Sequence, residues 1–273
     1  MMSLLETATH LLGQQVEYLH PLPGGDLSTV FAARYADGQH IVVKTSPAAH
    51  TEAHMLRALR CAGAKTPDVL AHDNAVLILE FCDNQGSIER AWGRLGHMLL
   101  ALDEEKETPT PVTYGWQKDY AFGALKIINT YSQHWPSFWK ANRLLCHAAH
   151  VPPALAKRLE DLARRLDDIL PAQPPACLLH GDLWGGNIVC GNDGTVTLID
   201  PACYYGDRDV DIAMLELFNT PGEDFWEAYP IRRDTDFYAR QAVYQLWPAL
   251  VHVRLFGSSY LSLVAGLLDR LKV

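Results

Sequence analysis

The chain has 273 residues, of which 48% are hydrophobic and 20% charged, so it is long enough for one ordinary globular domain or two lobes. Its formal net charge of −9 argues against a binder of duplex nucleic acid, which would need a basic face. No run approaches the roughly 18 apolar residues of a membrane span, and the first residues lack the basic and apolar regions of a secretory signal. We therefore expect a cytoplasmic monomer or weak dimer without nucleic-acid or membrane partners.

The first third of the chain has the pattern of β-strands around one helix. Residues 28–35 and 39–44 are rich in β-branched and aromatic side chains and are joined through Asp37–Gly38, a dipeptide typical of hairpin turns. Helix-forming residues from Pro47 to Arg60 predict a helix, and the apolar run 75–81 has the length of a strand. These elements predict a small strand-rich lobe.

Candidate nucleotide-binding residues lie on both sides of this hairpin. Gly24, Gly25 and Ser28 precede its first strand, where glycines let backbone amides approach a phosphate, although Gly-Gly before a strand is also typical of a simple turn. Lys44 ends the second strand, like the lysine that meets the α- and β-phosphates in protein kinases. Glu52, eight residues later on the predicted helix, is its natural ion-pair partner. We predict that these five residues bind a nucleotide.

The end of this lobe predicts a hinge, and the remainder of the chain is mainly helical. The strand that ends at Glu80 and Cys82 would bring backbone groups to the edge of an adenine, so both residues join the predicted cofactor-binding set. Apolar side chains then recur at helical spacing in three later segments: 92–102, 155–169 and 237–271. The sequence predicts an α+β, bilobal protein-kinase-like fold. Its lobes would be a nucleotide-binding lobe over residues 1–82 and a catalytic and substrate lobe over residues 83–273.

The segment H-G-D-L-W-G-G-N at residues 180–187 carries the strongest chemical signal. It places Asp182 five residues before Asn187, and Asp200 follows a short apolar run. Phosphoryl transfer needs a carboxylate that orients a hydroxyl nucleophile and two oxygen ligands for magnesium, and protein kinases use the same spacing. We predict that Asp182 is the catalytic acid/base and that Asn187 and Asp200 hold Mg²⁺ beside ATP. His180 is expected to brace the loop.

The residues after Asp200 argue against a typical peptide kinase. Pro201 replaces the Phe-Gly of the protein-kinase motif, and a helical pattern resumes within about ten residues. This leaves no room for a phosphorylated activation loop. A small molecule or a sugar carried on a protein is therefore a better acceptor than a peptide hydroxyl.

Residues 180–187 and 200–218 closely resemble the signatures of the fructosamine (ketosamine) kinase family, a branch of the aminoglycoside-phosphotransferase-like kinases. The second segment reads D-P-A-C-Y-Y-G-D-R-D-V-D-I-A-M-L-E-L-F, with Asp209 where the family has Glu. The resemblance implies ATP-dependent phosphorylation of a sugar hydroxyl on a free or protein-bound ketoamine. The phosphorylated adduct then falls apart, which repairs the glycated amine. The resemblance also implies that Trp184 offers a face to the substrate, although a core aromatic that braces the loop explains it equally well.

Two segments depart from the family pattern. Asp103 stands where the family usually shows His, and the acidic run 104–107 that follows could receive a cationic amine but fits a solvated helix end better. Residues 114–123 stand where the family shows F-G-x-x-x-D-N-x-[IL]-G: Asp119 is kept, but Tyr120 replaces the Asn. Because this segment belongs to the substrate side, Asp119 is a predicted substrate residue. The nucleotide chemistry is better supported than the ketoamine preference.

Two other functions stay open. The first is a kinase of another small amino alcohol or an aminoglycoside on the same fold. The second is a pseudokinase that only binds, which is disfavoured because the four residues of the phosphoryl-transfer set are intact: Lys44, Asp182, Asn187 and Asp200.

Overall fold

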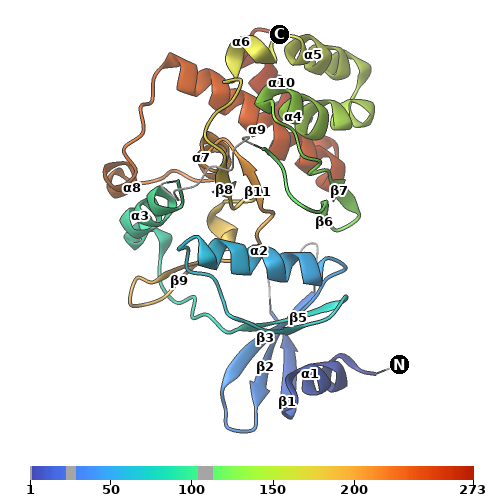
Figure 1. Ribbon diagram of the computed structural model, residues 1–273, viewed down its shortest axis with the longest axis vertical. Helices are drawn as coiled ribbons and strands as arrows, with labels where there is room; N and C mark the ends of the chain where they lie inside the picture. The colour runs from blue at the N-terminus through green and yellow to red at the C-terminus, as the bar shows by residue number, and fades with distance from the viewer. Residues whose placement is uncertain (1, 23–28, 104–112) are drawn as a thin grey trace.

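The computed structural model describes residues 2–22, 29–103 and 113–273, and it has two lobes of different composition. One lobe is built on an antiparallel sheet and the other mainly on helices, and they lie at opposite ends of the long axis (Figure 1). The α+β, bilobal fold predicted from the sequence is therefore confirmed.

The sheet of the smaller lobe has five strands in the order β1-β2-β3-β5-β4, and each neighbouring pair is antiparallel. The elements of this lobe are α1 (Leu4–Leu12), β1 (Val16–Pro21), β2 (Thr29–Tyr35), β3 (His40–Thr45), α2 (Ala49–Cys61), β4 (Val69–His72) and β5 (Val76–Glu80). The predicted hairpin is β2–β3, and Gly38 in its turn has a φ of 91°, which glycine adopts without strain. Helix α1 was not predicted, although Ser3 and Glu6 form a capping box at its start.

The two central strands bury both of their faces, which explains why they are continuous apolar runs. Side chains alternate between the faces of a strand. Ile41 and Val43 pack in the cluster on the α1 side, whereas Val42 packs with Leu77 on the α2 side. Lys44 follows Val42 by two residues, so its side chain leaves the sheet toward α2.

The larger lobe combines helices with three short two-stranded ladders (Figure 1). The ladders pair β6 (Tyr120–Phe122) with β7 (Leu125–Ile127), β8 (Cys177–Leu179) with β11 (Tyr204–Gly206), and β9 (Ile188–Cys190) with β10 (Val196–Leu198). The helices are α3 (Trp92–Asp103), α4 (Trp135–Trp139), α5 (Pro153–Ala163), α6 (Leu166–Ile169), α7 (Asp209–Phe218), α8 (Glu223–Ala228), α9 (Thr235–Phe256) and α10 (Leu261–Arg270), with short helical turns η1 (Ile88–Arg90), η2 (Lys140–Leu144), η3 (Leu145–His150), η4 (Gly185–Asn187) and η5 (Ser258–Tyr260). Of the helices in the described residues, none combines the length and the apolar character needed to cross a bilayer.

The long helical pattern at the C-terminus is divided in the structure. Helix α9 ends at Phe256, and Gly257 has a φ of 90°, a backbone conformation that interrupts a helix and that glycine tolerates. Helix α10 follows after η5 and packs back against α9. The turn between them brings Tyr260 beside the end of α9, which matters for the cavity described below.

Arg143 is a fully buried cation in the core of the larger lobe. Its guanidinium donates to the carbonyl of Ile128 at 2.6 Å and to Oδ1 of Asn129 at 2.7 Å. It also lies over the rings of Tyr204 and Trp247, 4.3 and 4.8 Å from their centroids. The charge is therefore stabilised by hydrogen bonds and by aromatic faces together.

We predict that Arg143→Met lowers the free energy of unfolding by about 2–5 kcal/mol, because two buried acceptors lose their donor. Urea denaturation followed by circular dichroism measures this change. Arg34→Met is the control, since Arg34 is 51% exposed and lies 3.9 Å from Glu17. Its effect should stay below about 1 kcal/mol. Equal effects of the two substitutions would contradict the role given to Arg143.

Candidate active site

Lys44 lies at the junction of the two lobes and contacts two carboxylates. Its Nζ is 2.8 Å from Oε1 of Glu52 on α2 and 2.8 Å from Oδ1 of Asp200, which follows β10. The Lys44 side chain is 6% exposed and that of Glu52 is fully buried. Burial alone would lower the pKa of Lys44, but the two carboxylates outweigh burial and raise it above its ordinary value. The ammonium is therefore charged in the folded protein.

The loop after β8 is shaped by backbone constraints that the sequence H-G-D satisfies. Gly181 has a φ of 78°, and a Cβ there would lie 2.2 Å from the carbonyl oxygen of Ala202, so only glycine fits. His180 is fully buried, and burial lowers its pKa to about 4. Its Nε2–H donates to the carbonyl of Ile199 at 2.9 Å, and its Nδ1 accepts from the backbone N–H of Asp182 at 3.3 Å. The neutral imidazole thus braces the loop.

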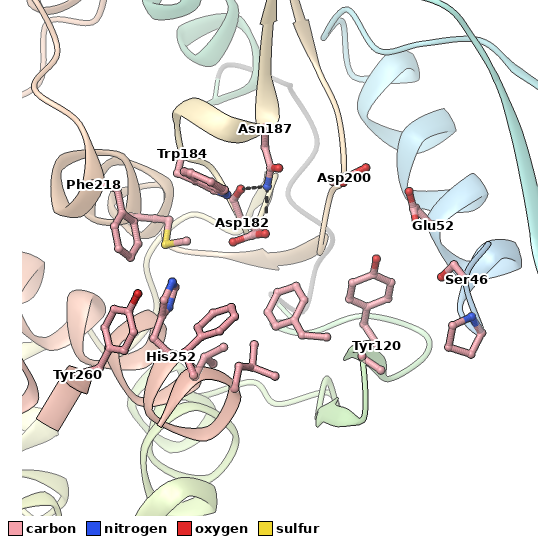
Figure 2. A pocket seen from close by; sticks show the side chains of 18 of the residues that line it. Ser46, Glu52, Tyr120, Asp182, Trp184, Asn187, Asp200, Phe218, His252 and Tyr260 are labelled. Atoms are coloured by element: carbon pink, nitrogen blue, oxygen red, sulfur yellow. Dashed lines mark hydrogen bonds between the residues drawn. The ribbon is translucent and has the colours of Figure 1, made fainter. Parts of the chain in front are cut away.

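Asp182 and Asn187 contact each other across this loop (Figure 2). The Asn187 amide nitrogen donates to the backbone carbonyl of Asp182 at 2.8 Å and to its Oδ2 at 3.0 Å. The nitrogen end of Asn187 is occupied in this way, which leaves its amide oxygen for another partner. Burial raises the pKa of Asp182 to about 7, and the hydrogen bond from Asn187 opposes that rise.

Asp211 on α7 anchors the loop of residues 180–187, which carries the predicted catalytic residue Asp182; the sequence motif did not predict this role for Asp211. Its Oδ2 accepts from the N–H of His180 at 2.7 Å and its Oδ1 from the N–H of Gly181 at 2.9 Å. Burial raises the pKa of this carboxyl to about 7, and both hydrogen bonds act in the other direction. The available signal in the sequence was an Asp inside the long motif that begins D-P-A. Spacing alone could not identify the backbone groups that it accepts from.

One cavity of about 590 Å³ collects most of the predicted site residues (Figure 2). The predicted residues that line it come from both lobes and comprise Lys44, Glu52, Asp182, Trp184, Asn187 and Asp200. Charged and amide groups therefore gather at the part of the cavity between the lobes. This is an arrangement that can hold phosphates and a divalent cation beside a carboxylate.

The other part of the cavity has aromatic walls that the sequence did not predict. Phe218 comes from the end of α7, His252 and Phe256 from α9, and Tyr260 from η5. The Nδ1–H of His252 donates to the carbonyl of Pro248 at 2.8 Å, because a carbonyl oxygen can only accept. Its Nε2 is then left as an acceptor.

Trp184 joins the two parts of the cavity. Its side chain is 41% exposed and meets the ring of Phe218 at a centroid distance of 6.3 Å. Trp184 therefore does not lie in the core, and it lines the cavity next to Asp182 (Figure 2).

Other predicted residues lie outside the described lining of this cavity. Asp119 is engaged elsewhere: its Oδ1 accepts from the N–H of Asn129 and its Oδ2 pairs with Lys126, both at 2.8 Å. Glu80 accepts from the backbone N–H of Asp68 at 3.1 Å, and Cys82 is half-buried where β5 ends. The predicted phosphate-binding residues Gly24, Gly25 and Ser28 lie outside the described residues.

Asp103 does not face the cavity. It is almost buried at the end of α3, where the hydroxyl of Tyr229 donates to it and Arg208 lies 3.6 Å away. Burial raises its pKa to about 6, and Tyr229 and Arg208 oppose that rise. Asp103, which stands where the family pattern has His, is therefore part of a packed network of polar side chains. The acidic run 104–107 lies outside the described residues.

The fold and this site define a phosphotransferase of the protein-kinase-like kind, in which a lysine, a carboxylate and two oxygen-bearing side chains meet between two lobes. The model of the fructosamine kinase family matches residues 2–273, and the chain belongs to that family. The crystal structure of a Thermobifida fusca protein assigned as a fructosamine-3-kinase has the same fold, with a TM-score of 0.86 and 28% identity over 98% of this chain and 97% of that one.

Two relatives are similar to this chain in sequence. The probable ketoamine kinase YniA of Escherichia coli is 31% identical over 275 residues, which cover 94% of this chain and 93% of the relative. The chloroplastic protein-ribulosamine 3-kinase of Arabidopsis thaliana is 30% identical over 224 residues, or 78% of this chain and 67% of the relative. A spectinomycin phosphotransferase solved with ADP and spectinomycin shares the fold alone, with a TM-score of 0.63 at 15% identity.

We predict that Asp211→Asn reduces the turnover number for phosphate transfer by about tenfold or more, because an amide nitrogen would face a backbone N–H and release the catalytic loop. The loss of one buried acceptor should also lower the free energy of unfolding by about 1–3 kcal/mol. Steady-state kinetics and urea denaturation measure the two effects.

Asp193→Asn is the matched control for this substitution. Asp193 also accepts from a backbone N–H, that of Thr195 at 2.8 Å, but in the exposed turn between β9 and β10. Its turnover should equal that of the wild type. A fully active Asp211→Asn enzyme would remove Asp211 from the positioning of the loop.

Proposed function

We propose that the protein transfers the γ-phosphate of ATP to a sugar hydroxyl of a ketoamine, a fructosamine or ribulosamine adduct of a free amine or a protein lysine. One observation carries the proposal: Lys44, Asp182, Asn187 and Asp200 line the same cavity as an exposed aromatic ring, Trp184. The ketoamine and ribulosamine kinases to which the chain is similar support the choice of acceptor. Loss of the phosphorylated adduct would then repair the glycated amine.

In this proposal the two lobes have different roles, and the boundary between them follows residue 82. Residues 1–82 hold the nucleotide and residues 83–273 carry the catalytic loop and the acceptor. Lys44 offers its charged ammonium to the phosphates and is itself held by Glu52. The roles of Gly24, Gly25, Ser28, Glu80 and Cys82 at the nucleotide stay predictions, as do a cytoplasmic location and a monomeric or weakly dimeric state.

The donor set fits a magnesium ion. Asn187 directs its amide nitrogen at Asp182 and so keeps an oxygen free, and Asp200 adds a carboxylate that is 40% exposed on the cavity side. Oxygen atoms of this kind are the ligands that magnesium prefers. When bound, the ion would neutralise charge on the phosphoryl group as it is transferred.

Asp182 is the group that we assign to the acceptor hydroxyl. Its pKa of about 7, raised by burial, suits a carboxylate that takes up a proton near neutral pH. The contact with Asn187 fixes the direction of the carboxylate. Beside it, Trp184 offers a flat face against which the apolar side of a sugar ring can pack.

The proposal is tested by phosphate transfer from ATP to a panel of fructosamines, ribulosamines, aminoglycosides and choline-like amino alcohols. We expect turnover with at least one ketoamine, at a kcat/KM well above that for the other classes. Transfer only to an aminoglycoside or an amino alcohol would keep the site roles and overturn the acceptor. The absence of transfer to every acceptor, with ATP still bound, would indicate a pseudokinase.

We predict that Asp182→Asn lowers the turnover number by roughly 10²–10⁴-fold, because it removes the carboxylate charge and basicity at nearly constant volume. The KM for ATP should change little, since the carboxylate faces the acceptor. Steady-state kinetics with varied ATP and varied acceptor separate these parameters. A variant that keeps wild-type turnover would exclude Asp182 as the acid/base.

We also predict that phosphate transfer requires magnesium and that Asp200→Asn loses most of the activity, because the charge that balances the ion is removed. Titration of ATP binding against magnesium, followed by calorimetry, provides a readout that does not depend on turnover. Here the variant should lose the dependence of ATP affinity on magnesium. Full activity of the wild type in excess chelator would refute the metal assignment.

A further inference from the structure

The carboxylate of Glu52 is only half satisfied by hydrogen bonds. Its Oε1 accepts from Lys44, but its Oε2 is buried and has no hydrogen-bond partner among the described residues. Buried carboxylate oxygens are rarely left without a donor, because the loss of water is then uncompensated. A donor for Oε2 is therefore expected close by.

Tyr120 extends toward Glu52 from the other lobe. Figure 2 shows its ring rising from the floor of the cavity, with the hydroxyl turned toward the space between Asp200 and Glu52. Burial raises the pKa of Tyr120 well above its ordinary value, and the carboxylates of Glu52, Asp200 and Asp182 raise it further. The phenol therefore keeps its proton and can only approach these groups as a donor.

Tyr120 in turn affects the pKa of Glu52. Burial raises the pKa of the Glu52 carboxyl, and both the ammonium of Lys44 and the hydroxyl of Tyr120 oppose that rise. The Tyr120 hydroxyl thus stabilises the ionised form of Glu52, which is the form that holds Lys44.

The position of Tyr120 in the fold means that a hydrogen bond from it to Glu52 would link the β6–β7 hairpin to the Lys44–Glu52 pair. Tyr120 begins β6 and is paired with Ile127 of β7 in a hairpin that Asp119 closes through Asn129 and Lys126. The next residues of the same strand and its turn, 121–123, line the cavity. The hairpin therefore lines the same cavity as Lys44 and Glu52.

We propose that Tyr120 is a positioning residue that donates its phenolic hydrogen to Oε2 of Glu52 and so ties the β6–β7 hairpin to the lysine that holds the nucleotide. Asp119, predicted as a substrate residue, would act here through the hairpin that it braces. The proposal rests on the proposed function in one respect, since it assumes that Lys44 binds the phosphates of ATP.

The test compares Tyr120→Phe, Glu52→Gln and the double variant with the wild type. Tyr120→Phe removes one hydroxyl and keeps the ring, so kcat/KM for ATP should fall roughly 10- to 100-fold, the usual effect of losing a hydrogen bond to a charged group. The KM for the acceptor should change less than the ATP parameters. The double variant should be no worse than Glu52→Gln alone, because both substitutions remove the same contact.

Tyr114→Phe is the matched control. Tyr114 is also buried, and its hydroxyl donates to the carbonyl of Pro174 at 2.7 Å, away from the cavity. This variant should lower the melting temperature without changing the ATP parameters. The proposal is wrong if Tyr120→Phe behaves in the same way or raises only the KM for the acceptor. It is also wrong if the fold-losses in kcat/KM for ATP of Tyr120→Phe and Glu52→Gln multiply in the double variant. Tyr120 then only packs the hairpin.

A failure of the proposed function can be told apart from a failure of this inference. Calorimetric binding of magnesium and a non-hydrolysable ATP analogue needs no acceptor, and the same four proteins are compared in it. We expect weaker binding in Tyr120→Phe, and equally weak binding in Glu52→Gln and the double variant. This result would support the role of Tyr120 even if no ketoamine is phosphorylated, whereas unchanged binding in Tyr120→Phe overturns it.

Discussion

The site depends on one buried ammonium that is shared between two carboxylates. Lys44 comes from the sheet, Glu52 from the helix that covers it, and Asp200 from the larger lobe, 156 residues away from Lys44 in sequence. A buried lysine is stable as a cation only where opposite charge compensates for lost water. The three residues therefore form an ion-pair network that joins the two lobes at the cavity. Lys44 points toward the two carboxylates because alternate side chains of β3 face α2.

The loop that carries Asp182 is held by a different kind of interaction, in which backbone N–H groups donate to one buried carboxylate. Asp211 accepts two consecutive N–H groups, neutral His180 links the loop to Ile199, and Gly181 permits the close approach to Ala202. Their effect is that Asp182 meets Asn187 in one orientation, which is the condition for a carboxylate to act on a hydroxyl.

The cavity changes character along its length. Charges and amides lie where the lobes meet, whereas the part beneath α7, α9 and η5 is walled by aromatic side chains such as Phe218, Phe256 and Tyr260. A ligand with a strongly charged end and a flatter, less polar end matches this division. In the proposed function the aromatic part, which lies beside Trp184, is the part of the cavity that would contact the acceptor.

The sequence by itself determined the elements whose geometry is local. Asp182 and Asn187 meet because five residues of one loop join them, and Lys44 reaches Glu52 because an apolar strand runs directly into a helix. The long motif after Asp200 was sufficient to indicate the family. Such features depend on residue spacing and backbone preference, which a sequence displays directly.

Only the tertiary structure decided which side chains reach the cavity from distant elements. Spacing could not show that Asp119 closes a hairpin while its neighbour Tyr120 turns toward Glu52, or that Asp211 anchors a loop 30 residues earlier. Nor could it show that Gly257 divides the last helical segment and places Tyr260 beside Phe256. The physical reason is that neighbouring residues of a strand point in opposite directions. Packing between elements far apart in the chain decides which of these directions faces the site.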